Sequence, residues 1–336
     1  MALPRFGARG PLQPVQPMRH VSGFSDRVGL DAFGVSPDDT IVMRVEPLDP
    51  AARRWLERRL PGLYWRGAVL SAFQGGEWRR APARWAHAPA SAGGASLALY
   101  REAVDHPYLV IPEGWTPTGK MRVLASDAGE RRLVSQPTRR MRVLLAQSKE
   151  KLPLRPPIPL ETDTQGIPES VRRWAEGFSG TPREKLAAAM RELRSWRYAL
   201  SVPGKGALLD AFIRTRTGYC ELFATTLALS LRLWGVPARV VHGYLGGEWN
   251  ETGGYALVRA RHAHAWVEAW LDGRWVRLDP TPPARRSALA RPWPKWMQLW
   301  DAVRLAWYRY VLEFESADRS RLWRALQEML AWIAGL

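Results

Sequence analysis

The stretch TGYCELFATTLALSLRLWG, residues 217–235, joins the only cysteine of the chain to a long apolar pattern that predicts a buried helix. The helix should end at Gly235, just before Pro237, because glycine commonly follows a helix C-terminus. Cys220 then lies at the helix start, where backbone N–H groups and the helix dipole stabilise a thiolate. Gly218 allows a tight turn into the helix and leaves space in front of the sulfur. The alternative is a small core residue, since free cysteine is among the most buried residue types.

Two predicted strands downstream carry the side chains that a thiol nucleophile requires. The segments HAHAWVEAW, residues 262–270, and RWVRLDP, residues 274–280, are joined by a tight turn at residues 271–273. His264 and Asp279 lie at nearly equal distances from this turn, so they can be cross-strand neighbours on one face. An imidazole oriented by a carboxylate is the base that a cysteine nucleophile needs.

The rest of the sequence predicts an α+β protein. Runs rich in β-branched, aromatic and leucine residues alternate with turn signals over residues 29–148, which predicts antiparallel strands. Residues 63–78 predict a hairpin, because Gly75 and Gly76 can adopt positive φ. Five prolines in residues 152–168 indicate a domain boundary, since proline cannot continue a helix or a central strand. We therefore expect five parts along the chain. They are an N-terminal extension (residues 1–28), a β-rich domain (29–150), a proline-rich linker (151–168), an α+β core (169–288) and C-terminal amphipathic helices (289–336).

Helix signals begin the predicted core and recur at the end of the chain. Thr181 as N-cap and Glu184 complete a capping box, which predicts a helix running to about Trp196. The last two predicted helices, residues 299–315 and 320–336, repeat apolar residues at steps of three and four. They either pack on the body of the protein or form a membrane-proximal stalk, because Trp and Arg suit a membrane interface.

Composition narrows the classes of protein that the chain can represent. Its 336 residues, 46% hydrophobic with 18 Trp, indicate a globular protein of two domains. A formal net charge of +17 is compatible with three kinds of partner: nucleic acid, an anionic membrane or an acidic polymer. The arginines are interleaved with acids and no nucleic-acid-binding motif occurs, so we expect no nucleic-acid partner. No segment reaches the roughly 18 apolar residues of a membrane span, and residues 1–12 lack the apolar core of a signal peptide.

The order of a helix-borne Cys, then His, then Asp resembles the transglutaminase-like superfamily of papain-type cysteine enzymes. Residues 218–283 resemble the core of bacterial transglutaminase-like membrane proteins of the TgpA type, nearly without gaps, and the resemblance extends upstream through residues 62–80 and 22–34. It implies a papain-like transglutaminase core behind a β domain. In that family this portion lies in the periplasm between two groups of membrane helices, which implies a periplasmic or extracytoplasmic location and a membrane surface nearby.

The resemblance implies a role for each residue of the triad. Cys220 would be the nucleophile, His264 the general base and Asp279 the orienting carboxylate, acting on protein or peptide substrates without a metal or organic cofactor. The family usually reads CEHFA or CEHYA, whereas this chain has CELFA with Leu222 in place of the histidine. That departure could alter a pocket wall or remove a substrate contact. The acceptor of the acyl group is an amine in a transglutaminase and water in a protease or amidase.

Four further residues are candidates for substrate binding or for stabilising an oxyanion. Trp196 or Tyr198 could supply a second oxyanion donor beside the Cys220 N–H. Glu221 either touches substrate or favours the first helical turn through the dipole. Trp266 shares a face with His264, so it either packs in the core or shields the imidazole from water.

Two rival interpretations remain open at this point. His262 and His264 form H-x-H on a strand with Asp279, Glu268 and His242 elsewhere, which could indicate a metal site without a recognisable ligand spacing. A catalytically silent binding or scaffold module of the same fold is the other rival, because a fold does not establish an activity.

Overall fold

The computed structural model describes most of the chain between residues 24 and 317. The described residues are 24, 27–30, 39–88, 93–102, 104, 106–119, 121–134, 140–148, 154–203, 206–283 and 293–317. The predicted helix over residues 320–336 and most of the predicted N-terminal extension lie outside them.

Five antiparallel strands form the sheet that carries the candidate site, in the order β19-β18-β15-β3-β8. A two-residue turn joins β18 to β19, with φ of 50° at Asp272 and 74° at Gly273, so the predicted hairpin is confirmed. The strands are β3 (Tyr64–Leu70), β8 (Ile111–Pro112), β15 (Ala238–Leu245), β18 (Ala263–Leu271) and β19 (Arg274–Leu278).

A second, six-stranded antiparallel sheet has the order β16-β17-β2-β7-β12-β9. Its strands are β2 (Ile41–Pro47), β7 (Leu97–Arg101), β9 (Trp115–Pro117), β12 (Met141–Gln147), β16 (Glu248–Asn250) and β17 (Tyr255–Arg259). Both large sheets thus contain strands from before and after the proline-rich segment. The boundaries of the predicted domains stay a prediction, but the two halves of the chain share their sheets.

Three small sheets complete the β structure. The first is β1-β5-β4, the second is β11-β10-β6, and the third is a parallel pair, β13-β14. In the first, Gly75 and Gly76 have φ of 58° and 78°, as the predicted hairpin requires. The strands are β1 (Arg27–Gly29), β4 (Ala72–Gln74), β5 (Glu77–Arg79), β6 (Trp85–His87), β10 (Val123–Ser126), β11 (Arg131–Leu133), β13 (Arg197–Tyr198) and β14 (Thr217–Gly218).

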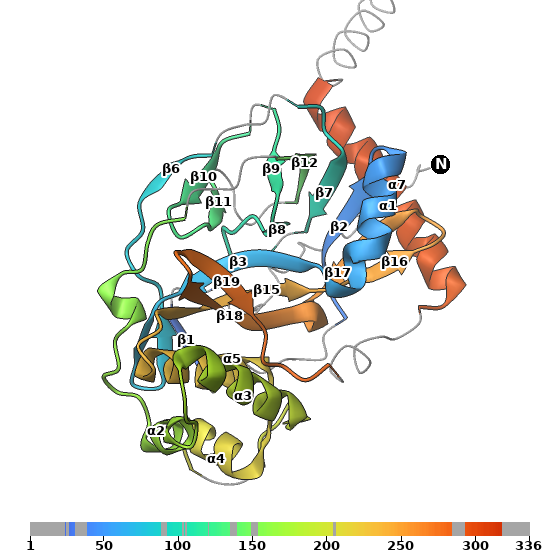
Figure 1. Ribbon diagram of the computed structural model, residues 1–336. Coiled ribbons are helices and arrows are strands. Elements are labelled where there is room, and N and C mark those ends of the chain that lie inside the picture. The colour runs from blue at the N-terminus through green and yellow to red at the C-terminus, as the bar shows by residue number, and fades with distance from the viewer. Residues whose placement is uncertain are drawn as a thin grey trace, which may run out of the picture.

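Helices α2 to α5 gather at one end of the molecule, on one side of the core sheet (Figure 1). The helices are α1 (Pro50–Arg59), α2 (Glu169–Glu176), α3 (Pro182–Ser195), α4 (Leu208–Thr215), α5 (Cys220–Leu233) and α7 (Lys295–Ala317). Short 3-10 turns are Leu60–Gly62, Pro159–Glu161 and Ala260–His262. The capping box of Thr181 and Glu184 is present as predicted. Helix α1 was not predicted, although Asp49 accepts from the Ala52 N–H as its N-cap.

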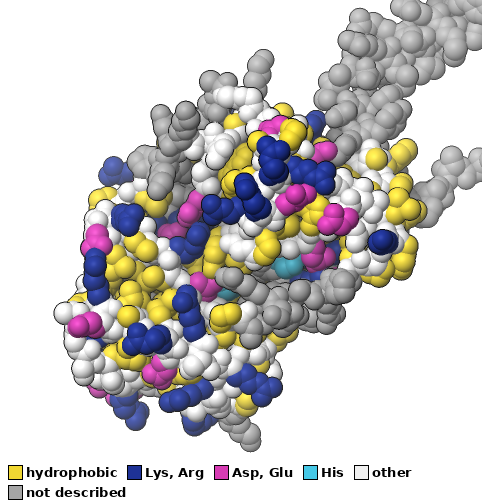
Figure 2. Space-filling view, turned by 45° about the vertical axis from the view of Figure 1, so that its right-hand side comes forward, with side chains coloured by type: hydrophobic (Ala, Val, Ile, Leu, Met, Phe, Trp, Pro, Cys, Tyr) yellow, Lys and Arg dark blue, Asp and Glu magenta, His cyan; other side chains and the backbone are white. Residues whose placement is uncertain are grey.

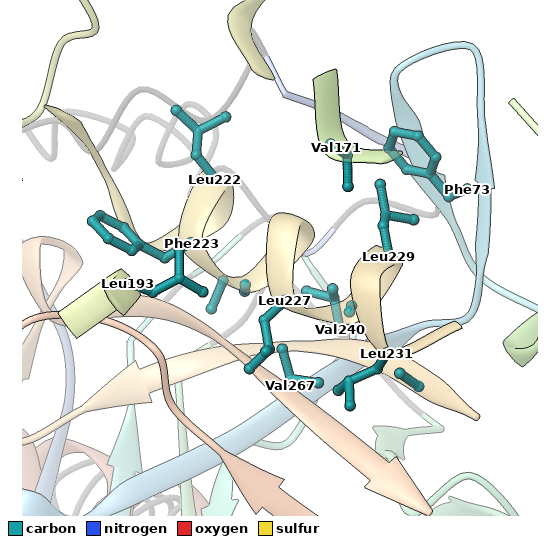
Figure 3. Packing of buried hydrophobic residues seen from close by; sticks show 14 of the residues in the cluster. Phe73, Val171, Leu193, Leu222, Phe223, Leu227, Leu229, Leu231, Val240 and Val267 are labelled. Carbon is teal, nitrogen blue, oxygen red and sulfur yellow. The ribbon is translucent and has the colours of Figure 1, made fainter. Parts of the chain in front are cut away.

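Helix α5 is the centre of the larger core. All of its residues from Cys220 to Arg232 are buried, and it packs against β15 and β18. Figure 3 shows Leu227 facing Val240 and Val267 of these two strands. The helix ends as predicted: Gly235 has a φ of 77°, and the N–H of Val236 donates to the Leu231 carbonyl. The predicted α+β fold is therefore present.

Candidate active site

Cys220 is the first residue of α5, with Tyr219 as the N-cap residue. Its side chain is fully buried in the core cluster that also holds Ala265 of β18. Gly218 is needed in the approach to the helix, because a Cβ there would lie 2.6 Å from the Phe212 ring and 3.0 Å from Leu222. The sequence therefore places the thiol where a helix N-terminus favours its anion.

The next residue fixes the tip of α5 to the sheet. Glu221 is fully buried, and its Oε2 lies 2.7 Å from Nε2 of His242 on β15. His242 pairs with Ala265, and the next pair along the same two strands is Gly243 with His264. The start of α5 is thus held against the two strands at the level where His264 lies.

His264 and Asp279 meet directly. His264 Nε2 lies 2.8 Å from Asp279 Oδ2, with the imidazole fully buried. Asp279 follows the end of β19 instead of lying within it, because the ladder of β18 and β19 ends at the pair Val267–Leu278. Continued by one residue, this register puts Asp279 diagonal to His264 on the same face. The predicted neighbours are brought together, and only the expectation that Asp279 is strand-borne was wrong.

Tyr64 is a site residue that the sequence did not reveal. Its hydroxyl donates to Asp279 Oδ2 at 2.6 Å, the same oxygen that faces His264. The Tyr64 ring packs edge-on against Trp266 at 5.1 Å, and the Arg277 guanidinium lies 4.1 Å above it. Tyr64 comes from β3, which is 215 residues away in sequence, and no local signal marks it.

These contacts keep the Asp279 carboxyl ionised. Burial acts to raise its pKa, but the charge and hydrogen bond of His264, the Tyr64 hydroxyl and the Thr281 N–H together hold the pKa well below its ordinary value. An ionised Asp279 fixes the orientation of the imidazole through Nε2. It leaves Nδ1 as the ring nitrogen that can accept a proton from a nucleophile.

A cavity of about 230 Å³ adjoins Asp279. Arg194 of α3 lines it and donates to the Asp279 backbone carbonyl at 2.8 Å, so a helix of the core holds the segment after β19 in place. The other lining residues are Tyr64, Leu245, Thr281, Pro282 and Pro283.

The other predicted site residues lie in different surroundings. Trp196 is buried, and its ring packs at 5.0 Å from Phe212 in the core. Tyr198 lies beside the segment that leads into α5, because β13 pairs it with Gly218. Glu221 does occupy the first turn of α5, but its carboxylate faces His242 and has no exposed surface for a substrate. Trp266 is buried, with its ring 6.2 Å from that of His264.

The histidines of the rival metal interpretation point to different partners. His242 faces Glu221, and His262 Nδ1 accepts from the Arg259 N–H. Within the described residues, no three His, Cys, Asp or Glu side chains are grouped as ligands for a metal ion. Leu222, at the position of the usual family histidine, is fully buried in the apolar core (Figure 3).

With this geometry established, comparison with known families assigns the class of protein. Residues 172–280 match the transglutaminase-like superfamily, and residues 1–152 match the TgpA N-terminal domain. The chain therefore belongs to the transglutaminase-like superfamily. The match of residues 1–152 to the TgpA N-terminal domain, together with that core, assigns it to the TgpA type.

Individual relatives agree with this assignment. The chain is 29% identical over 329 residues to a protein-glutamine gamma-glutamyltransferase of Pseudomonas aeruginosa, covering 82% of this chain and 47% of that protein. It therefore spans about half the length of that relative. It is also 38% identical over 79 residues to the uncharacterized protein YebA of Bacillus subtilis, covering 22% of this chain and 11% of that protein.

Solved structures show the same fold. The periplasmic domain of TgpA from Pseudomonas aeruginosa bound to ethylmercury superimposes with a TM-score of 0.62 at 24% identity, covering 79% of this chain and 99% of that domain. A second structure of that domain gives a TM-score of 0.60 at 24% identity, covering 80% of this chain and 96% of the other. Among the described residues, no helix is long and apolar enough to cross a bilayer.

Proposed function

We propose that the protein catalyses acyl transfer from peptide-bound carboxamides, with Cys220 as nucleophile, His264 as general base and Asp279 as the carboxylate that orients it. The observation that carries the proposal is the 2.8 Å contact of His264 Nε2 with Asp279, on the strand against which the Cys220 helix packs. The relative named as a protein-glutamine gamma-glutamyltransferase supports glutamine side chains as the acyl donor.

The reaction proceeds through a thioester. His264 Nδ1 takes the thiol proton, and the Cys220 sulfur attacks the carboxamide carbonyl to form a tetrahedral oxyanion. The imidazolium then protonates the leaving nitrogen, ammonia departs, and the thioester remains on Cys220. A primary amine attacks the thioester and passes a proton to His264. The C–S bond then breaks, the amide product leaves, and the imidazolium returns the proton to the Cys220 thiolate.

Two features of the protein assist these steps. The first N–H groups of a helix have no acceptor within it, so the Cys220 N–H is a candidate donor to the oxyanion. The cavity beside Asp279 is the proposed approach for the substrate. Because the thiol is fully buried, the side chains that cover it must move aside when the substrate binds.

The setting that we propose is the periplasmic or extracytoplasmic face of a bacterial membrane, with cell-envelope proteins or peptides as substrates. The structures of the TgpA periplasmic domain support this location. Hydrolysis of the thioester by water, which would make the protein a protease or amidase, is the alternative outcome of the same first step.

Incubation with a glutamine-peptide library, with and without a labelled primary amine, tests the proposal by mass spectrometry. Transfer predicts incorporation of the amine, whereas hydrolysis predicts conversion of glutamine to glutamate or peptide cleavage. His264→Gln should abolish either product. His87→Gln is the matched control, because His87 is exposed on β6 and should leave turnover unchanged. Equal turnover in wild type and His264→Gln would contradict the proposal.

A further inference from the structure

Helix α7 presents one row of large apolar side chains to solvent. Trp296, Leu299, Trp300, Val303 and Trp307 are 54% to 70% exposed. At about 100° per residue, their steps of three and four place them on a single stripe of the helix.

The opposite face of α7 attaches it to the protein. Leu305 is buried against Tyr100 and Tyr255 of the six-stranded sheet. Asp301 accepts from Arg44 at 3.1 Å and from the Tyr255 hydroxyl at 2.6 Å. These contacts fix the rotation of the helix, so the apolar stripe is held outward.

The stripe is not ordinary surface. Scattered single apolar residues are common on protein surfaces, but a contiguous apolar row marks a site of interaction. Among the described residues, five of the eight exposed large apolar side chains lie on α7, and the other three are Leu48, Val134 and Leu200. Figure 2 looks onto the side where α7 lies and shows hydrophobic side chains at the surface of its right-hand part.

The chemistry of the stripe favours a lipid surface. Three of its five residues are Trp, which has an apolar ring with a polar N–H and suits the boundary between headgroups and acyl chains. Lys295 and Arg304 are exposed and lie at the two edges of the stripe, where their stems can follow it and their charges can reach phosphate groups. Neither has an ion-pair partner among the described residues, and the acid in this part of α7, Asp301, is buried.

A cavity lined by both cations and acids adjoins the stripe. It measures about 460 Å³ and is lined by Trp296 and Trp300 of the stripe, by Arg140 and Arg304, and also by the acids Asp39, Glu102 and Asp301. Burial lowers the pKa of Arg140, and the nearby Arg304 charge lowers it further, against the opposing charge of Glu102. Arg140 is already paired with Glu102 at 2.9 Å, so the charge of Arg304 is the one available to an anion here.

We propose that the α7 stripe docks on the surface of a bilayer that contains anionic phospholipid, with its Trp side chains in the interfacial layer and Arg304 on lipid phosphate. This inference does not depend on the proposed acyl transfer.

Co-sedimentation of the full chain with vesicles tests the docking. One set holds 30% phosphatidylglycerol in phosphatidylcholine and the other holds phosphatidylcholine alone. We expect binding to the anionic set, weakened by added salt. The double variant Trp296→Ser/Trp300→Ser should bind roughly tenfold more weakly because apolar surface is lost, and Arg304→Ser about fivefold more weakly.

Matched controls separate docking from general stickiness. Leu200→Ser removes an exposed apolar side chain outside α7, and Arg173→Ser removes an exposed charge on α2, so both should bind like the wild type. Circular dichroism checks that each variant is folded. Three results would overturn the proposal: full binding by the Trp variant, equal binding to both vesicle sets, and no binding to either set. Self-association in sedimentation velocity that the Trp variant abolishes would instead make the stripe an interface between copies of this chain.

Discussion

Tyr64→Phe isolates the contribution of one hydroxyl to the candidate triad. The substitution keeps the ring contacts with Trp266 and Arg277 and removes the 2.6 Å hydrogen bond to Asp279. Hydrogen bonds to charged groups contribute roughly 1.5 to 3 kcal/mol. Since Tyr64 is only partly buried, we take the lower end, a loss of about 1.5 kcal/mol in the free energy of unfolding at neutral pH.

The pH dependence of this loss follows from the Asp279 carboxyl. Its pKa in the folded protein lies below the ordinary value, so ionised Asp279 stabilises the fold above the unfolded pKa of about 4. That stabilisation disappears as the pH falls through the folded pKa. Tyr64 keeps its hydrogen bond as long as Asp279 is ionised in the folded protein, so the difference between wild type and Tyr64→Phe should persist in mild acid and shrink only as the pH approaches that low folded pKa.

Two assays follow from the same substitution. Urea unfolding followed by Trp fluorescence at pH 7 and at pH 3.5 measures the stability difference. Iodoacetamide labelling of Cys220 should also slow at neutral pH, because His264 is less well oriented as its base. If the whole loss of about 1.5 kcal/mol appears in the activation free energy of labelling, the rate falls by about tenfold. Tyr100→Phe is the control, because it removes a tyrosine–carboxylate bond to Glu46 in the six-stranded sheet. A stability loss that has already disappeared at pH 3.5, where folded Asp279 is still ionised, or labelling slowed as much by the control, would refute the reasoning.

The remaining predictions concern the sheet that supports the site. Burial acts to raise the pKa of Glu268, but Arg66 and Arg239 outweigh it and lower the pKa to about 2. Its stabilisation should be present above pH 4.5 and be lost as the pH falls from there towards 2, and urea titrations at several pH values measure this. Glu268→Gln should cost roughly 3 to 5 kcal/mol at neutral pH, because it leaves two buried guanidinium groups without their carboxylate; an unchanged melting temperature would contradict this. Gly243→Ala should prevent stable folding, since its Cβ would lie 1.9 Å from a backbone oxygen of β3, whereas Gly62→Ala meets no atom within 4 Å and should melt like the wild type in calorimetry.

The sequence predicted the parts of the fold and site that depend on local pattern. The apolar stretch before Gly235 located α5 and its end, and the positions of His264 and Asp279 about one turn predicted their contact. Helix α1 was missed even though Asp49 and Pro50 form a local start signal. It lies within residues 29–148, where runs typical of strands outnumber helix signals.

Long-range pairing could not be predicted from the chain alone. Tyr64 reaches Asp279 only because β3 inserts beside β15 in the core sheet, and nothing in residues 62–80 specifies that partner. The same insertion brings Arg66 to Glu268 at 3.0 Å. A sequence pattern shows that a strand forms, whereas the choice of its neighbour depends on packing across the whole molecule.

Intact-protein and peptide mass spectrometry after incubation with a glutamine peptide tests the role of Cys220 most directly. Trypsin should release residues 217–232, which contain the only cysteine of the chain. An acyl adduct on this peptide, absent in Cys220→Ala and strongly reduced in His264→Gln, is the predicted result. No adduct in the wild type, or an adduct of the same mass that persists in Cys220→Ala, would contradict the assignment of Cys220 as the nucleophile.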